Sequence, residues 1–164
     1  MAQAIFIDAE KHDLRYVELS DAESCLDEMH ELLGGHVELA FRWNMDAFLF
    51  VDEEGFLKPM QHFFRITWRT DQPFAGHGIV VGRERFVDNN PAGKWIGHHP
   101  LPFGIDWLRP HIGWLSREQF NAWARANASE PSVRLTVIGG GGKPVSSTLE
   151  TFGRYADPIK REKK

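Results

Sequence analysis

The sequence predicts an α+β fold in which a single antiparallel or mixed sheet carries two main helices packed on one face. Three observations lead to this prediction: short apolar segments of strand length, two amphipathic segments that open on capping residues, and glycines that punctuate both. The chain has 164 residues, of which 42% are hydrophobic and 12% aromatic. It is therefore long enough for one well-buried core but hardly for two large domains.

Two segments have the pattern of amphipathic helices. Each opens on a serine that is followed three residues later by Glu or Gln, which is the capping-box pattern, at Ser20 and at Ser116. Apolar residues then recur at helical spacing, and a glycine pair that begins at Gly34 supplies the C-terminal stop of the first helix. We therefore expect helices over about residues 21–33 and 117–127.

Several segments have the length and composition of β-strands. In one of them Val37, Leu39, Phe41 and Trp43 alternate with other residues, which predicts a strand with these four side chains on one buried face. Turn residues such as those of 52–55 separate the strands. The expected strands lie near residues 3–7, 14–19, 36–43, 47–51, 78–82 and 133–138, and a less clear strand pattern covers 63–68.

The chain is expected to have three parts. Residues 1–83 form an α+β core, residues 84–142 add an aromatic loop, a helix and a strand to the same domain, and residues 143–164 form a flexible tail. The glycine run before the tail resembles a phosphate-binding loop, but Pro144 stands where Ser or Thr would hold Mg²⁺. We interpret this run as a linker, and no cofactor is expected.

Composition excludes several classes of function. The net charge of −4 and the pI of about 6.0 argue against phosphate backbones as the main partner. A single cysteine, Cys25, excludes an internal disulfide, and its place on an apolar helix face indicates a core residue. Without a signal peptide or a long apolar run, the sequence predicts a cytoplasmic protein with no membrane contact.

An aromatic segment beyond residue 94 is the leading candidate for a partner-binding surface. Trp and Arg are enriched at interfaces, although the same residues would also serve as a lid that completes the core. The sequence favours neither of these two interpretations over the other. The candidate partner-binding residues are Trp95, His98, His99, Phe103, Trp107, Arg109 and Trp114.

A second candidate site is an acidic and histidine-containing pocket around the turn at 52–55. Carboxylates and imidazoles can bind a metal or act as acid and base, but a solvated acidic turn explains the same residues. No metal-ligand spacing or catalytic constellation accompanies them, so no metal ion and no catalytic residue is assigned; His98, His99 and Asp106 would be the first ligands to consider. The candidate pocket residues are His36, Glu38, Asp52, Glu53, Glu54 and His77.

Nucleic-acid binding is a third, less favoured alternative. Arginines close to aromatic residues can hold phosphates while bases stack on the rings. The acidic balance of the whole chain weighs against it, and the sequence does not indicate the oligomeric state. The arginines concerned are Arg65, Arg69, Arg83 and Arg85.

Residues 3–83 resemble a small domain family of unknown function that phages and plasmids carry. The resemblance lies in three motifs, LGGHVE at 33–38, DEEGFLK at 52–58 and GHGIVVG at 76–82, although His36 replaces the usual tyrosine and the LPxN run is absent. The resemblance implies no catalytic residues. It implies an accessory protein of a mobile element in a bacterial host, which acts by contact with a host or phage protein, for example as an inhibitor of a host defence protein. An enzyme or small-ligand binder remains the alternative.

Overall fold

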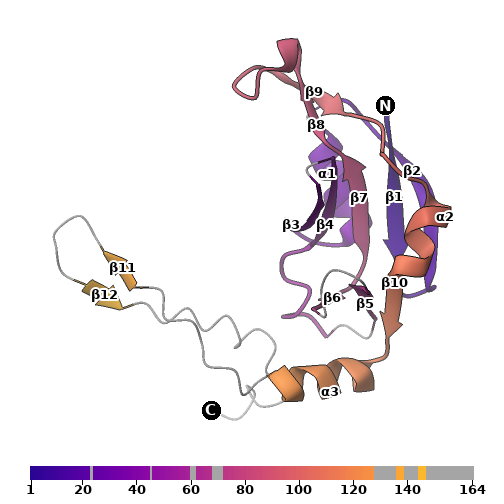
Figure 1. The fold of residues 1–164 in the computed structure, drawn as a ribbon, viewed down its shortest axis with the longest axis vertical. Helices are drawn as coiled ribbons and strands as arrows, with labels where there is room; N and C mark the ends of the chain where they lie inside the picture. Colours follow the sequence, from indigo (N-terminus) through magenta and orange to yellow (C-terminus); the bar gives the residue numbers. More distant parts are fainter. Residues whose placement is uncertain are drawn as a thin grey trace. The chain divides into compact units, whose positions relative to one another are not determined.

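A computed structural model describes residues 1–22, 24–44, 46–59, 62–67 and 72–127, together with the backbone of 136–138 and 144–146. The chain divides into two units, residues 1–117 and 118–164, which are described separately. Residues 84–117 therefore belong to the same unit as the core expected over 1–83 (Figure 1).

The main sheet of the first unit has five antiparallel strands in the order β2-β1-β7-β4-β3. Its strands are β1 (Ala2–Asp8), β2 (Asp13–Leu19), β3 (Val37–Trp43), β4 (Ala47–Asp52) and β7 (Gly78–Gly82). A smaller antiparallel sheet has the order β10-β5-β6, and β8 and β9 form a hairpin. The smaller sheet consists of β5 (Phe63–Ile66), β6 (Pro73–Ala75) and β10 (Ile112–Leu115). The hairpin consists of β8 (Glu84–Phe86) and β9 (Trp95–His98).

The expectation of a single sheet with two main helices is wrong. The described part of the first unit contains ten strands in three antiparallel sheets and is mostly β. Its helices are α1 (Ser24–Leu33), the short α2 (Ile105–Leu108) and the 3₁₀ turns η1 (Val87–Asn89) and η2 (Arg109–His111). The sequence missed β6, β8, β9 and β10 because strands of three or four residues between glycines and prolines are too short to show a period.

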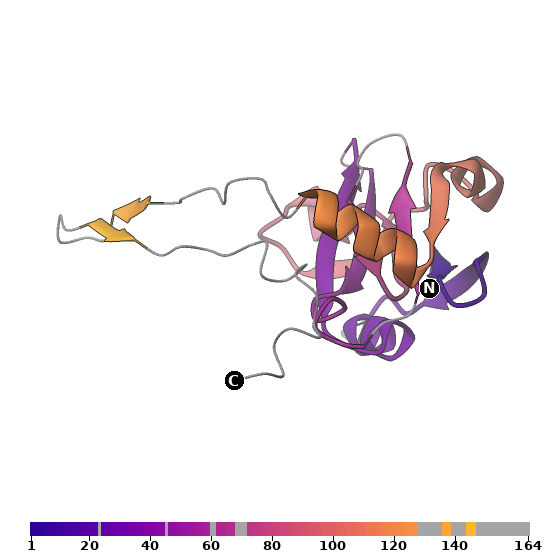
Figure 2. The ribbon, with the colours of Figure 1, turned by 90° about the horizontal axis from the view of Figure 1, so that it is seen from below.

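Both faces of the main sheet are buried. Successive side chains of a strand point to opposite faces, so Ile5 and Ile7 of β1 join one cluster while Ala4 and Phe6 join the other. The first cluster packs against the β10-β5-β6 sheet and α2, and the second packs against α1. Figure 2 shows α1 and α2 on opposite sides of the strands. This arrangement explains why the central strands read as continuous apolar runs.

Strand β3 does not present one apolar face, which corrects the prediction from alternation. Its pairing with β4 shifts register between Leu39 and Phe41. Val37 and Leu39 therefore pack with the α1 cluster, whereas Phe41 and Trp43 pack with the opposite one. A bulge inserts one residue and reverses the side to which all later side chains point, and a sequence pattern does not reveal it.

The first predicted helix exists, but it begins later than predicted, at Ser24. The Ser20 N–H donates to Glu28 Oε2 at 2.8 Å, and the Ser20 and Ser24 hydroxyls are 2.8 Å apart. The expected capping partner, Glu23, lies outside the described residues. The carboxylate of Glu28 thus accepts the hydrogen bond from the serine N–H that a capping box predicts for a glutamate three residues after the serine.

The second unit contains helix α3 (Arg117–Asn127), although Arg117 itself is the last residue of the first unit. The helix predicted over 117–127 is confirmed. Strand β11 (Thr136–Ile138) pairs with β12 (Pro144–Ser146) in a two-stranded sheet. The strand expected at 133–138 is predicted as part of the main sheet. This prediction is wrong, because β11 pairs with β12. Residues 133–135 and most of the expected tail lie outside the described residues.

Candidate partner-binding groove

An apolar pocket of about 360 Å³ lies between α1 and the β8–β9 hairpin. We call it the hairpin pocket. Figure 1 shows that β7 leads into the hairpin, which extends beyond the end of the main sheet. The pocket is lined by Ala22, Cys25, Leu26, Met29, Val37, Phe50, Glu84, Phe86, Trp95 and His98.

Helical and strand geometry direct these side chains into the pocket. On α1, Cys25 and Met29 are one turn apart and buried, while Leu26 beside them is 53% exposed. On β9, Trp95 and His98 both line the pocket although they are three residues apart. A register shift in the hairpin, together with Gly97 at φ 114°, allows this, because a bulge brings residues of unlike parity to one side.

A second cavity of about 510 Å³ adjoins the hairpin pocket. We call it the basic pocket because Arg42, Arg83 and His99 line it, against the single carboxylate of Glu84. Phe50, Glu84 and Phe86 line both cavities, so the two lie side by side, and we call the two together the hairpin groove. The remaining residues of the basic pocket are Leu39, Phe48, Asn89 and Pro91.

His98 is the buried polar side chain of the groove. It is 8% exposed, and its Nδ1 has no hydrogen-bond partner among the described residues. Its ring meets that of Trp95 edge to face, with the ring centres 5.4 Å apart. Burial lowers the pKa of His98, and Asp21 opposes this only in part, so the imidazole is neutral at pH 7.

Cys25 is a core residue, as the sequence indicated. The side chain is buried, and burial, helped by Glu28 and Asp21, raises the pKa of its thiol to about 11. A nucleophilic cysteine requires a lowered pKa, because the thiolate is the reactive form. Cys25 therefore contributes apolar surface to the groove and not a nucleophile.

The candidate partner-binding residues do not form one surface. Trp95, His98 and His99 line the groove, whereas the other four belong to the α2 region. There, ring contacts run from Trp43 through Phe103 to Trp107, with centres 5.5 and 4.4 Å apart. Trp114 stacks on His12, and Arg109 Nη1 lies 3.4 Å from Asp13 Oδ1. Phe103 and Trp114 pack against the core, so here the lid interpretation holds, and Trp107 alone of these aromatics is exposed.

Asp52 is a structural carboxylate and not part of an acidic pocket. Its side chain is fully buried, and Oδ2 lies 2.5 Å from Lys58 Nζ, which also donates to the Gly34 carbonyl at 3.0 Å. Its Oδ1 accepts from the Glu54 N–H at 3.0 Å. A side chain at Gly35 would overlap both charged groups. The DEEGFLK and glycine-pair motifs thus encode one buried ion pair, which we call the Asp52–Lys58 pair.

The remaining candidate pocket residues do not supply a catalytic centre. His36, Glu38, Glu53 and Glu54 are exposed. His77 lies with Asp8 and Glu10 in a group of possible metal ligands. The atoms of two of its three members are already engaged, because the Ala9 N–H donates to His77 Nδ1 at 3.2 Å, while Arg15 and the Lys11 N–H donate to the two oxygens of Asp8. We assign no metal site there.

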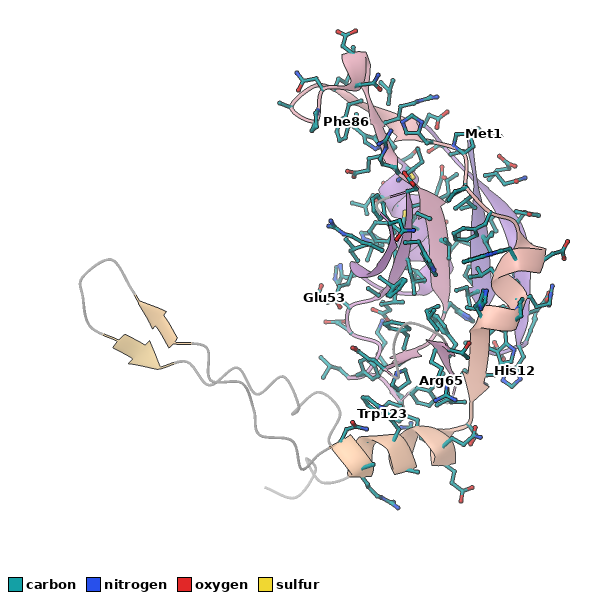
Figure 3. All side chains as sticks on the ribbon, viewed as in Figure 1. Met1, His12, Glu53, Arg65, Phe86 and Trp123 are labelled. Atoms are coloured by element: carbon teal, nitrogen blue, oxygen red, sulfur yellow. The ribbon has the colours of Figure 1, made fainter. Side chains whose placement is uncertain are left out.

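The arginines expected for nucleic acid are dispersed. Arg83 lines the basic pocket, and Arg85 lines a separate cavity beside β1 and β2. Figure 3 shows Arg65 at the opposite end of the first unit from Phe86 of the hairpin. Arg69 lies outside the described residues. Such a distribution does not give the continuous basic face that tracks a phosphate backbone.

Sequence reasoning missed several residues of the groove. Leu26 follows the apolar spacing of the predicted helix, which indicates a buried residue, yet it is more than half exposed. Phe86 lies in β8, whose three residues are too few to show a strand period in the sequence. Arg42 lines the groove because β3 is an edge strand, which only the strand order reveals.

Comparisons of the chain with protein-family models, with curated proteins and with solved structures found no match. Among the helices that the structure describes, none is long and apolar enough to span a membrane.

Proposed function

We propose that this chain is a non-enzymatic binding protein that acts by direct contact between the hairpin groove and another protein. The observation that carries the proposal is that an apolar pocket and a basic pocket lie side by side, with a leucine that is 53% exposed in the wall of the first. Interfaces combine a buried apolar centre with a polar rim, and the groove offers both within one concave surface.

The composition of the groove supports a protein partner. Phe50, Phe86 and Trp95 line the hairpin pocket with aromatic surface, and two arginines line the adjoining basic pocket. Aromatic residues and arginine are enriched among the few residues that carry most of the energy of an interface. Covering Leu26 would remove apolar surface from water, which favours binding by about 25 cal/mol per Å².

The genetic context belongs to the same proposal. The resemblance of residues 3–83 to a phage- and plasmid-borne domain family supports an accessory protein of a mobile element, located in the cytoplasm of a bacterial host. We propose a host protein as the partner, for example a component of a defence system that the contact inhibits. The resemblance supports this context, and the groove supports the mode of action.

A matched pair of substitutions tests the proposal. Leu26→Asp places a charge at the groove, whereas Leu57→Asp places one at a leucine that is 57% exposed on the acidic turn. Tagged wild-type protein and both variants are used to capture proteins from extracts of bacteria that carry the element. We expect a stoichiometric partner with the wild type and with Leu57→Asp, and its loss with Leu26→Asp. A partner retained equally by all three would refute the role of the groove.

A further inference from the structure

We infer that His77 is a pH-sensitive latch: its neutral ring holds the start of the turn between β1 and β2, and its protonated ring releases it. The turn covers residues 9–12 and lies outside the hairpin groove. Figure 3 shows His12 of this turn toward the opposite end of the first unit from Phe86 of the hairpin. The inference therefore concerns a second place in the molecule and does not depend on the proposed function.

One ring atom of His77 lies near both a donor and an acceptor. The Ala9 N–H donates to His77 Nδ1 at 3.2 Å, and Asp8 Oδ1 lies 3.7 Å from the same nitrogen. A backbone N–H can only donate, so Nδ1 is the unprotonated nitrogen and the proton of the neutral ring is on Nε2. The hydrogen bond to Ala9 thus exists in only one protonation state of His77.

Protonation exchanges these two partners. A proton taken from solvent adds to Nδ1, which then donates and no longer accepts from the Ala9 N–H. The charged ring is attracted to the Asp8 carboxylate, which already lies within 4 Å of it. Ala9 is fully buried, so its N–H is left without an acceptor and away from water unless the turn opens locally. The proton that strengthens one contact of His77 therefore breaks the contact that holds the turn.

The surroundings of His77 keep the ring neutral at pH 7. Its side chain is 29% exposed, so water can deliver a proton to it. Burial lowers the pKa of His77; two carboxylates oppose this shift, and a histidine and an arginine add to it. The ring therefore takes its proton only in acidic solution. The four groups that act on it are Asp8 of β1, Glu10 of the turn, Arg15 of β2 and His62 before β5.

Asp8 is ionised in the range where His77 takes up its proton. Burial favours the neutral carboxyl, but hydrogen bonds from the Lys11 N–H and the Arg15 guanidinium outweigh it and lower the pKa of Asp8. These donors lie 3.1 Å from Oδ1 and 2.9 Å from Oδ2. A carboxylate oxygen has two lone pairs, so Oδ1 can accept a second hydrogen bond from the protonated ring.

The release is confined to the start of the turn. Strands β1 and β2 pair along their whole length, from Asp8 opposite Asp13 to the far end. His12, at the end of the turn, stacks on Trp114 with the ring centres 5.2 Å apart. Protonation of His77 should therefore free one backbone N–H and leave the sheet folded.

Hydrogen exchange of the Ala9 amide, followed by NMR in a buffer with EDTA, tests the inference. Each rate is divided by that of an unfolded peptide at the same pH, which gives a protection factor independent of the chemistry of exchange. We expect the protection of Ala9 to fall about 5- to 10-fold from pH 7.5 to pH 5, the value of one hydrogen bond. The midpoint should coincide with the titration of the His77 ring protons. At pH 7.5, long-range nitrogen–proton spectra should show the ring proton on Nε2.

Two variants separate the titration from the fold. His77→Asn places an amide oxygen near the position of Nδ1, and this acceptor does not titrate, so Ala9 should be equally protected at both pH values. His62→Asn removes a neighbouring histidine and should leave the pH response in place.

Four results would overturn the inference. They are a ring proton on Nδ1 at pH 7.5, constant protection of Ala9 while His77 titrates, loss of protection on acidification in His77→Asn, and loss of the pH response in His62→Asn. The first two are measured on the wild-type protein, so they remain decisive if a variant does not fold. None of them bears on the comparison of Leu26→Asp with Leu57→Asp, so failure of this inference leaves the proposed function standing.

Discussion

The Asp52–Lys58 pair should make Lys58→Met more destabilising than Asp52→Asn, although each substitution removes one member of the same pair. Lys58→Met leaves a fully buried carboxylate whose one remaining bonded partner among the described residues is the Glu54 N–H. Asp52→Asn instead leaves a lysine whose side chain is 31% exposed and can turn to water. The difference arises because the two charges are buried to different depths.

The magnitudes follow from these environments. Removing one partner of a buried pair typically costs 3–5 kcal/mol, and the partial exposure of the lysine places Lys58→Met at the lower end, about 3 kcal/mol. In Asp52→Asn the amide oxygen still accepts the turn N–H, so the loss is mainly that of a charge-assisted bond, about 1–2 kcal/mol. The double variant contains no unpaired charge and should cost about as much as Asp52→Asn alone.

The assay is equilibrium unfolding in urea at pH 7, followed by both tryptophan fluorescence and circular dichroism. Coincident transitions justify a two-state fit, and the double-mutant cycle isolates the coupling between the two side chains. Lys94→Met, at an exposed lysine, is the control and should change stability by less than about 0.5 kcal/mol. A cost of Lys58→Met no greater than that of Asp52→Asn would refute the reasoning.

Four further predictions concern single groups. Gly35→Ala should cost about 1–3 kcal/mol because its Cβ overlaps the buried carboxylate, and Gly35→Asn should not recover it. At Gly34, where φ is 76° and space is open, Gly34→Asn should be milder than Gly34→Ala in the same assay, since asparagine tolerates this conformation. Burial lowers the pKa of His98, so the unfolded chain binds more protons than the folded chain below about pH 6.5. The free energy of unfolding should therefore fall from pH 7 to pH 5. A His98→Phe variant whose stability depends on pH as steeply as that of the wild type would contradict this. The Cys25 thiol, with a pKa of about 11, should react with a disulfide reagent far more slowly in the native than in the urea-unfolded protein at pH 8, and equal rates would contradict its burial.

Much of the local structure was predictable because it depends on neighbouring residues. Helix α3 follows from its capping pattern and apolar spacing, and strands β1, β2, β4 and β7 follow from apolar runs bounded by turn residues. The bulge in β3 was not predictable, because the alternation of its sequence is unbroken while its pairing with β4 shifts. The short strands of residues 84–115 were missed because three or four residues are too few to show a period, and β10 in addition pairs with β5, which is distant in the chain.

The candidate site shows the same division. Trp95, His98 and His99 were predicted as partner-binding residues from their residue types, and the structure places them in the groove. Trp107 and Arg109 were predicted on the same grounds but belong to the α2 region. Leu26 was missed because helical spacing alone does not tell which apolar residue of a helix remains uncovered.

By itself the sequence determined most of the longer apolar strands, helices α1 and α3, and the turn motifs, because each depends on short-range periodicity and backbone preference. The tertiary structure alone decided that the sheet is covered on both faces, that Asp52 is paired with Lys58, and that an apolar and a basic cavity meet at the hairpin. Most of these features join residues that are far apart in the chain. Asp52 and Lys58 are only six residues apart, but Lys58 also donates to the Gly34 carbonyl, 24 residues away. Their geometry is set by strand order and register, which the local pattern does not contain.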